Sequence, residues 1–209
     1  MHAGASERPS PTTPLLESVR RRRRRRVIGT LVSLALLGAI GAYLSPVIAR
    51  FAYTVRLVRA EPDLPYPIPV QGVSARKLTD QWGAPRSGGR RHQGIDIFAP
   101  CGTPVLSATE GIVFTVGENS LGGQIVRVLG PGGYWHYYAH LSRYGDVARG
   151  DRVQTGTVLG YVGQTGNARG TPCHLHYGVY AWGGGARNPY PLLTSAAPPR
   201  TADSAGRAR

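Results

Sequence analysis

The sequence is short of cysteine and of acidic residues, and the first shortage already excludes two classes of protein. Two cysteines among 209 residues cannot build a disulfide-dense scaffold or a four-thiolate zinc finger. A helix bundle is disfavoured by 29 glycines and 17 prolines, because both residue types destabilise helix interiors. The hydrophobic share of 41% is sufficient for a core, so the chain is not wholly disordered. Its length allows one ordinary domain with further segments at its ends.

The shortage of acids gives a net charge of +14, which is typical of nucleic-acid-binding proteins, but its distribution argues against that class. Residues 1–26 contain eight arginines and two glutamates, a net +6, and residues 27–60 add three arginines. Residues 61–209 hold the other 14 basic residues against nine acidic ones, a net +5. Most of the excess charge therefore lies in the first 60 residues, and we expect no nucleic-acid partner.

An arginine run directly precedes a long apolar segment. Arg20–Arg26 is an unbroken run of seven arginines, and Val27–Ala49 contains no charged residue over 23 positions. As a helix the apolar segment would be about 34 Å long, enough to cross the hydrocarbon core of a bilayer. Because cytoplasmic flanks carry the excess of Lys and Arg, residues 1–26 are predicted to lie in the cytoplasm and everything after Arg50 outside it. A cleaved signal peptide, with a small-residue site at Val47–Ala49, is the alternative to an anchor over 27–49.

Two further segments flank the remaining domain. Residues 50–70 contain four alternating prolines between Glu61 and Val70, a composition that favours extended polyproline geometry of about 3.1 Å per residue. We interpret residues 50–70 as a stiff linker that holds a domain over residues 71–193 away from the membrane. Residues 194–209 consist mostly of Ala, Pro, Ser, Thr and Arg without apolar periodicity, and they are predicted to form a disordered tail.

The domain over residues 71–193 contains short runs of β-branched and aromatic residues that are separated by glycine-containing turns. Strands that alternate with turn signals about every 8–12 residues are typical of an antiparallel all-β domain. No stretch of the domain shows a convincing helical period. The predicted strands lie within residues 111–116, 124–129, 134–140, 151–154, 158–162 and 174–180.

Five of the six histidines fall in this domain, and four of them form two groups on predicted strands. His174 and His176 are two residues apart, so a strand would project both imidazoles from one face. By the same rule Tyr138 and His140 are predicted to share a face, and His136 would share it too. Taken singly, each group is also compatible with aromatic packing in a core.

The fifth histidine is paired with a carboxylate. His92 and Asp96 lie four residues apart, but Gly94 and the flanking isoleucines disfavour a helix, so a turn that enters a strand is predicted. Imidazole and carboxylate are both good zinc ligands. By itself this spacing is a weak signal, and chance surface polarity is the alternative.

Taken together, and in this order within one small β domain, these motifs resemble those of the lysostaphin/LytM-type zinc metallopeptidases. The motifs are His92-x-x-x-Asp96, Tyr138-Ala-His-Leu141 and His174-Leu-His176. The resemblance covers about residues 70–193 and extends through Arg90–Ile97, Gly102–Val105, Gly160–Gly166 and Asn188-Pro189.

The resemblance implies a small antiparallel β-sheet with a substrate groove, and cleavage of peptide bonds in bacterial peptidoglycan. It implies that His92, Asp96 and His176 bind zinc. It also implies that His140 and His174 stand beside the metal and handle protons and the developing oxyanion. The chemistry agrees, because two neutral imidazoles and one carboxylate leave Zn²⁺ with one net positive charge and an open position for water.

Three residues near these motifs have less defined roles. His136 has no role in the family's pattern, and we interpret it as a core or groove-lining residue. Arg86 is interpreted as a solvent-exposed arginine, with contact to an acidic substrate group as the alternative. If Asp96 and His176 meet at one zinc ion, Cys101 and Cys173 are brought close together, and a disulfide is predicted. Thiolate ligation of zinc and two unpaired buried thiols are the alternatives.

The predicted function is that of a zinc metalloendopeptidase that hydrolyses peptide cross-links of peptidoglycan. The predicted location is the bacterial cytoplasmic (inner) membrane, with a single span and the catalytic domain on the periplasmic or extracellular side. The alternative is a non-catalytic domain of this fold that binds the wall or activates another wall hydrolase. Some control of the activity is expected, because uncontrolled cutting of the wall would be lethal, and an unidentified regulatory protein partner is one form that this control could take. The sequence leaves open which peptidoglycan bond is cleaved.

Overall fold

The computed structural model describes residues 13–195, with side chains from residue 17 onward. The chain divides into two compact units between Ala52 and Tyr53. The beginning of the predicted cytoplasmic segment, residues 1–12, lies outside the described residues, and so do residues 196–209 of the predicted tail.

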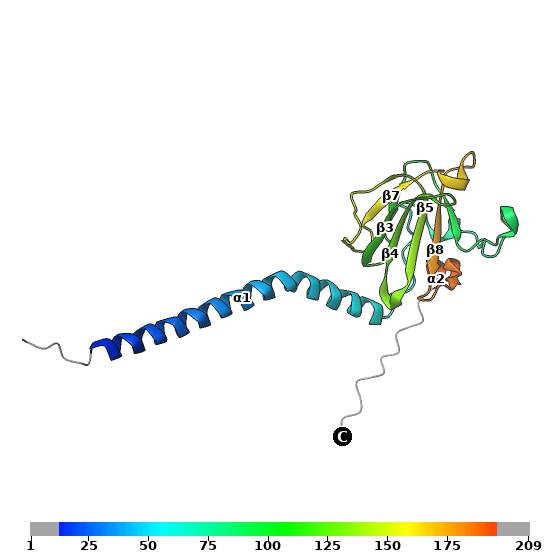
Figure 1. The fold of residues 1–209 in the computed structure, drawn as a ribbon. Coiled ribbons are helices and arrows are strands. Elements are labelled where there is room, and N and C mark those ends of the chain that lie inside the picture. The colour runs from blue at the N-terminus through cyan, green and yellow to red at the C-terminus, as the bar shows by residue number, and fades with distance from the viewer. Residues whose placement is uncertain (1–12, 196–209) are drawn as a thin grey trace, which may run out of the picture. The chain divides into compact units, whose positions relative to one another are not determined.

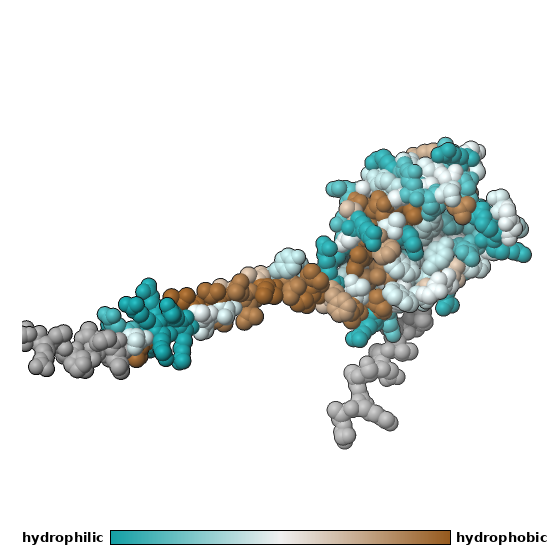
Figure 2. Space-filling view, in the orientation of Figure 1, coloured by the Kyte–Doolittle hydropathy of each residue, from teal (hydrophilic) through white to brown (hydrophobic). Residues whose placement is uncertain are grey.

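A single long helix, α1 (Thr13–Arg59), contains the arginine run and the apolar segment that follows it (Figure 1). Figure 2 shows the hydrophilic arginine block followed by a continuous hydrophobic stretch of this helix. Its most apolar window has a mean hydropathy of 2.1, and none of that window is buried by protein. By length and composition α1 is therefore a candidate membrane span, although a signal sequence would satisfy the same criteria.

The second unit is built on antiparallel β-strands, as the sequence predicts (Figure 1). Six of them are longer than three residues and supply most of the sheet: β1 (Ile95–Phe98), β3 (Gly111–Asn119), β4 (Gly123–Leu129), β5 (Trp135–Tyr144), β7 (Val158–Val162), which pairs beside β5, and β8 (His174–Tyr180). Short strands complete it: β2 (Pro104–Leu106), β6 (Arg152–Val153) and β9 (Ala186–Arg187). A short helix, α2 (Pro189–Thr194), follows the last strand.

The strand order is β1-β8-β5-β4-β3-β6, with β2 paired to β7 and β9 paired to β8. This order places β1, from the start of the domain, against β8, from its end. One face of β5 and β8 is apolar and fully buried, with Tyr138, Leu175 and Tyr177 at its centre. Because alternate residues of a strand point to opposite faces, their neighbours on β5 and β8 are left to form the other face.

His136 belongs to the buried face, in agreement with the interpretation as a core residue. Its side chain is fully buried, its Nδ1 lies 2.7 Å from the hydroxyl of Tyr177, and the edge of its ring packs against Tyr66. Burial lowers the pKa of His136 to about 3, so the imidazole is neutral in the folded protein at pH 7.

The predicted linker over residues 50–70 differs from the structure. Residues 50–59 continue α1, and residues from Tyr53 onward belong to the domain unit. Leu57, Tyr66 and Val70 are 3% exposed or less, and the backbone N–H of Tyr66 donates to Leu192 O. The apolar side chains of this segment bury against the sheet because this removes them from water. The domain therefore begins before residue 71 rather than after a free spacer.

Candidate metal centre and substrate groove

Two of the predicted zinc ligands face each other across a pair of antiparallel strands. Asp96 on β1 is the register partner of His176 on β8. Directly opposite residues of an antiparallel pair project from the same face, so the carboxylate and the imidazole meet without any distortion of either strand. His92 approaches from the turn before β1, where its backbone N–H donates to Ala84 O.

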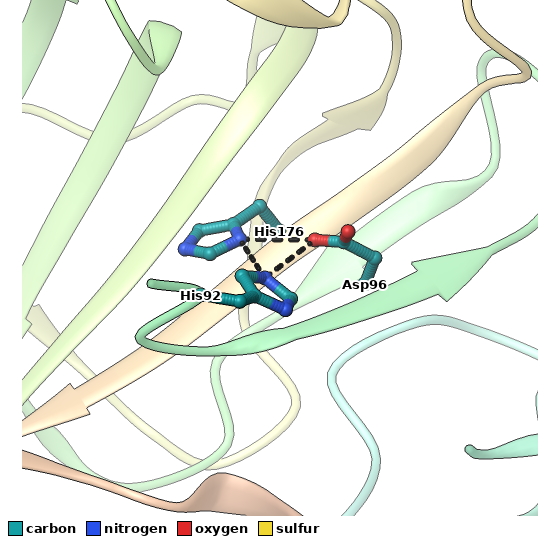
Figure 3. A group of neighbouring side chains, drawn as sticks. All are labelled: His92, Asp96 and His176. Atoms are coloured by element: carbon teal, nitrogen blue, oxygen red, sulfur yellow. Dashed lines mark hydrogen bonds and ion pairs between the residues drawn. The ribbon is translucent and has the colours of Figure 1, made fainter. Parts of the chain in front are cut away.

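The three side chains converge on one point (Figure 3). His92 Nε2 lies 2.9 Å from His176 Nδ1, and Asp96 Oδ1 lies 3.1 Å from the first of these nitrogens and 3.0 Å from the second. Ligands of a tetrahedral zinc ion with bonds of about 2.0–2.1 Å would be roughly 3.3 Å apart. Two imidazoles and a carboxylate at this spacing fit a zinc site. The three atoms lie a few tenths of an ångström closer together here than they would around a bound zinc ion.

Gly94 is required by the close packing of this site. A Cβ atom at Gly94 would lie 2.6 Å from Cε1 of His176 and 2.6 Å from Tyr177 O. Any larger residue would therefore push the imidazole of His176 away from Asp96. The glycine between His92 and Asp96, which by itself only argued against a helix, has a specific steric role.

A neighbouring loop orients the ligands. The Nδ1–H of His92 donates to Gln81 O over 3.0 Å, which leaves the lone pair of Nε2 directed at the site. The side chain of Gln81 accepts a hydrogen bond from the backbone N–H of Asp96. The guanidinium of Arg86 donates to Asp96 Oδ2, the carboxylate oxygen that faces away from the two imidazoles.

Arg86 and Gln81 are the residues of this site that sequence reasoning missed. Arg86 was interpreted as solvent-exposed, and its side chain is 37% exposed, but its guanidinium is also paired with Asp96, which the sequence did not predict. The available signal was the scarcity of acids, because a buried carboxylate in a basic domain needs a cationic partner and Arg86 is close to it in sequence.

His140 adopts a backbone conformation that the sequence pattern does not predict. Its φ is 65°, the left-handed region that few residues other than glycine enter, and its N–H donates to Gly122 O. The pairing of β5 with its neighbours also shifts register on both sides of this residue. These irregularities break the alternation of β5.

The prediction that His140 shares a face with Tyr138 and His136 is therefore wrong. Tyr138 lies in the core, where its hydroxyl accepts a hydrogen bond from Ala108 N–H. His140 instead turns toward the metal ligands, and its ring centroid lies 5.8 Å from that of His176. A cost of about 1–3 kcal/mol is typical of such a strained residue and is consistent with a functional role.

His174 and His140 form a second pair of imidazoles beside the three ligands, with 5.0 Å between their ring centroids. The Nδ1–H of His140 donates to Thr165 O over 2.9 Å, and the Nδ1–H of His174 donates to Pro172 O over 2.8 Å. Because a carbonyl can only accept, each neutral ring carries its proton on Nδ1 and leaves Nε2 as a proton acceptor.

Burial and mutual repulsion set the charges at this site. Burial, and then the neighbouring imidazoles, lower the pKa of His140 to about 4. Burial also lowers the pKa of His176. For Asp96 burial alone would raise the pKa, but hydrogen bonds from His176, His92 and Arg86 outweigh it and lower the pKa well below its usual range. These shifts favour the neutral form of His140 and His176 and the ionised form of Asp96, and neutral imidazole and carboxylate are the forms that bind a metal.

The ligands open into a groove of about 590 Å³. Tyr137, His140 and His176 line it on the sheet side. Arg86, Arg90 and Arg91 line it on the side of the loop that precedes β1. A groove of this size can hold a few residues of an extended peptide, and its arginines favour an anionic one.

A disulfide fixes the two strands that carry Asp96 and His176. Cys101 follows β1 and Cys173 directly precedes β8, and the structure joins them with 5.4 Å between their Cα atoms. The cross-link joins two cysteines that are 72 positions apart in the sequence, and it lies at the end of the site. Neither cysteine is available as a zinc ligand or as a free thiol.

Comparison with known proteins identifies relatives of this arrangement. The family described as Peptidase family M23 matches residues 90–189, which include His92, Asp96, His140, His174 and His176. The L-Ala–D-Glu endopeptidase of Bacillus subtilis (strain 168) is 37% identical over 139 residues, which are 61% of this chain and 42% of that protein. The glycyl-glycine endopeptidase ALE-1 of Staphylococcus capitis is 35% identical over 113 residues, 52% of this chain and 30% of that protein.

The chain thus spans less than half the length of these two relatives. Among solved structures, the catalytic domain of lysostaphin from Staphylococcus simulans superposes with a TM-score of 0.52 at 31% identity. The match covers 58% of this chain and 98% of that domain. Nearly the whole of a solved catalytic domain is therefore reproduced in sequence and in fold, and the chain belongs to peptidase family M23.

Proposed function

We propose that this protein is a zinc metalloendopeptidase that hydrolyses peptide cross-links of bacterial peptidoglycan. The observation that supports it is the convergence of His92, Asp96 and His176 in a groove, with His140 and His174 beside them. The two curated relatives described above are named as endopeptidases, one for an L-Ala–D-Glu bond and one for a glycyl-glycine bond. Because these bonds differ, membership of the family does not by itself define the bond.

We further propose that α1 anchors the domain in the cytoplasmic membrane and that the domain acts on its outer side. The arginine run before the apolar stretch supports this orientation, since positive charge is retained on the cytoplasmic side. An extracytoplasmic location also suits the disulfide, which would be unusual in a reducing compartment.

In this proposal His92, Asp96 and His176 hold the zinc ion. When bound there, zinc supplies Lewis acidity, which lowers the pKa of water and polarises the scissile carbonyl. Nε2 of His140 or His174, which is left free by the Nδ1–H hydrogen bond of each ring, accepts the proton of the attacking water. The imidazolium that results donates a hydrogen bond to the developing oxyanion and then passes its proton to the leaving amine. The lowered pKa of His140 keeps its imidazole unprotonated at neutral pH.

Replacing His140 by asparagine is expected to lower the rate of cleavage by about 100- to 10,000-fold while one zinc ion per chain is retained. Asparagine tolerates a positive φ, so the backbone of this strained position is preserved. The zinc-loaded full chain in detergent is incubated with intact peptidoglycan, and the released fragments are identified by mass spectrometry. Separated peptides whose masses define one bond are expected for the unmodified chain. Zinc binding by that chain without any released fragment would contradict the proposed activity.

Replacing Arg86 by glutamine is expected to weaken zinc affinity about 10- to 100-fold, because Asp96 loses the partner that orients it. Arg90→Gln is the matched control, since Arg90 also lines the groove but its guanidinium is bonded to Ser87. Zinc affinity is measured by competition with a chelator of known strength. Equal affinities for the two variants would show that the contact between Arg86 and Asp96 does not support the metal site.

A further inference from the structure

A patch of exposed aromatic and arginine side chains lies on the same sheet face as the metal centre. It consists of Phe114, Trp135 and Trp182 with Arg127 and Arg149, and is called the aromatic–arginine patch. Trp182 is 67% exposed and Phe114 is 42% exposed. The Trp135 ring lies 4.8 Å from that of Phe114 and 6.3 Å from that of Trp182, to which it is nearly parallel. The guanidiniums of Arg127 and Arg149 lie over the rings of Trp135 and Phe114, each at 5.2 Å.

Strand register makes this patch continuous with the groove. Ala139 pairs with His176, and Trp135 pairs with Tyr180, so all four residues project from one face of β5 and β8. Tyr180 lies four positions after His176 on β8, which corresponds to about 13 Å along the strand.

Aromatic rings bridge that interval. Tyr137 lies 6.0 Å from the ring of His176 and 6.3 Å from that of Tyr180, and both tyrosines line the groove. Burial raises the pKa of Tyr137 and of Tyr180, and the positive charge of nearby Arg127 partly offsets both increases. Arg127 is the register partner of Tyr137 and its guanidinium lies over the ring of Trp135, so it stands between the end of the groove and the exposed rings.

The exposure of Trp182 is built into the fold. It lies in the turn between β8 and β9, followed by Gly183 and Gly184 with φ values of 94° and 98°. A Cβ added at Gly133 would lie 3.5 Å from the ring of Trp182, so the opposite strand end approaches the indole closely. An indole of this size held at a turn with most of its surface in water loses hydrophobic stabilisation, which a bound partner would restore.

We propose that the aromatic–arginine patch is a second substrate-binding subsite that holds a peptidoglycan strand while a stem peptide enters the groove. This inference rests on the proposed function. Sugar C–H bonds carry partial positive charge and would stack on the negative faces of the indoles. Carboxylates of the stem peptides would pair with the two arginines, whose stacking on aromatic rings already restricts their rotamers. The site thus takes an anionic glycopeptide, and a sugar-free peptide would occupy only the groove.

The test compares Trp182→Ala with Tyr161→Ala, which removes another aromatic ring that carries a stacked arginine, 3.2 Å from Arg143. Binding of the full chain in detergent to intact peptidoglycan is measured by sedimentation in the His140→Asn background, so that the wall is not digested. Trp182→Ala is expected to weaken binding about tenfold. Arg149→Gln is expected to weaken binding at low salt, and the difference from the parent should disappear when salt is added, because salt screens the charge of Arg149. Tyr161→Ala is expected to bind like the parent.

Cleavage distinguishes this subsite from the groove. With His140 present, Trp182→Ala is expected to lower the rate on dilute intact peptidoglycan about tenfold and to leave the rate on a sugar-free cross-linked peptide unchanged. Unchanged binding and cleavage in Trp182→Ala would overturn the subsite while leaving the endopeptidase proposal standing. Weaker binding by this variant, with no cleavage even by the unmodified chain, would overturn the endopeptidase proposal and leave the subsite.

Quenching of Trp182 fluorescence by brominated lipids in reconstituted vesicles, without protection by peptidoglycan, would assign the patch to the bilayer and overturn the subsite.

Discussion

Replacing Asp96 by asparagine is expected to lower zinc affinity at least about 100-fold and the rate of peptidoglycan cleavage at least about 1,000-fold. The amide keeps the size of the side chain but removes the only negative charge among the three converging groups. A rate loss of this size corresponds to about 4 kcal/mol of transition-state stabilisation, within the range expected of a metal that polarises a carbonyl.

The surroundings of Asp96 make the effect large. Its Oδ1 lies within 3.1 Å of His92 Nε2 and His176 Nδ1, its Oδ2 accepts from Arg86, and the residue is 8% exposed. With asparagine in its place, the guanidinium of Arg86 would face the cation without a carboxylate between them, and repulsion would add to the loss of a ligand.

Zinc content after dialysis and the cleavage rate at saturating zinc are the two measurements. Asp80→Asn is the matched control, because Asp80 accepts from Trp82 N–H and Asn188 on the surface and contacts none of the three ligands. An Asp96→Asn chain that retained both zinc and full activity would exclude Asp96 as a metal ligand.

Replacing Cys101 and Cys173 by serine is expected to lower the free energy of unfolding by about 4 kcal/mol on the chain-entropy model. The size follows from the separation of 72 residues between the two cysteines, since a longer closed loop restricts the unfolded chain more strongly. For a domain of this size the change corresponds to a fall in Tm of roughly 8–16 °C.

The effect on the site is expected to be smaller than the effect on stability. β1 and β8 are also joined by backbone pairing from Ile95 to Phe98, so Asp96 and His176 stay in register in the folded state. Thermal unfolding of the double variant is compared with that of the unmodified chain with and without a reductant. The reduced chain and the variant should unfold at similar temperatures. Equal Tm values for the oxidised chain and the variant would show that the cross-link does not stabilise the fold.

Local patterns in the sequence were sufficient to predict the long helix and the antiparallel sheet. The arginine run followed by 23 uncharged residues predicted a long apolar helix, because length and charge alone decide whether a helix can span a bilayer. Alternation and glycine-rich turns predicted the antiparallel sheet, because strand formation follows the period of the side chains. The pairing of His174 and His176 on one face followed from the same rule.

The grouping of distant motifs came from their resemblance to a family rather than from any local rule. Asp96 and His176 are 80 residues apart, and only the antiparallel pairing of β1 with β8 makes them neighbours. Spacing along the chain carries no information about which strands pair, because register depends on which buried faces fit together.

Three features were decided by the tertiary structure alone. His140 turns toward His176 because of a positive φ and shifts in strand pairing, whereas simple alternation placed it on the same face as Tyr138. Arg86 pairs with Asp96 because the loop before β1 folds back over the site. Residues around Tyr66 join the core because the sheet offers them an apolar surface, although their prolines indicated a free linker. In each case long-range packing and hydrogen bonds outweigh the local preference, and these contacts are what a single sequence does not contain.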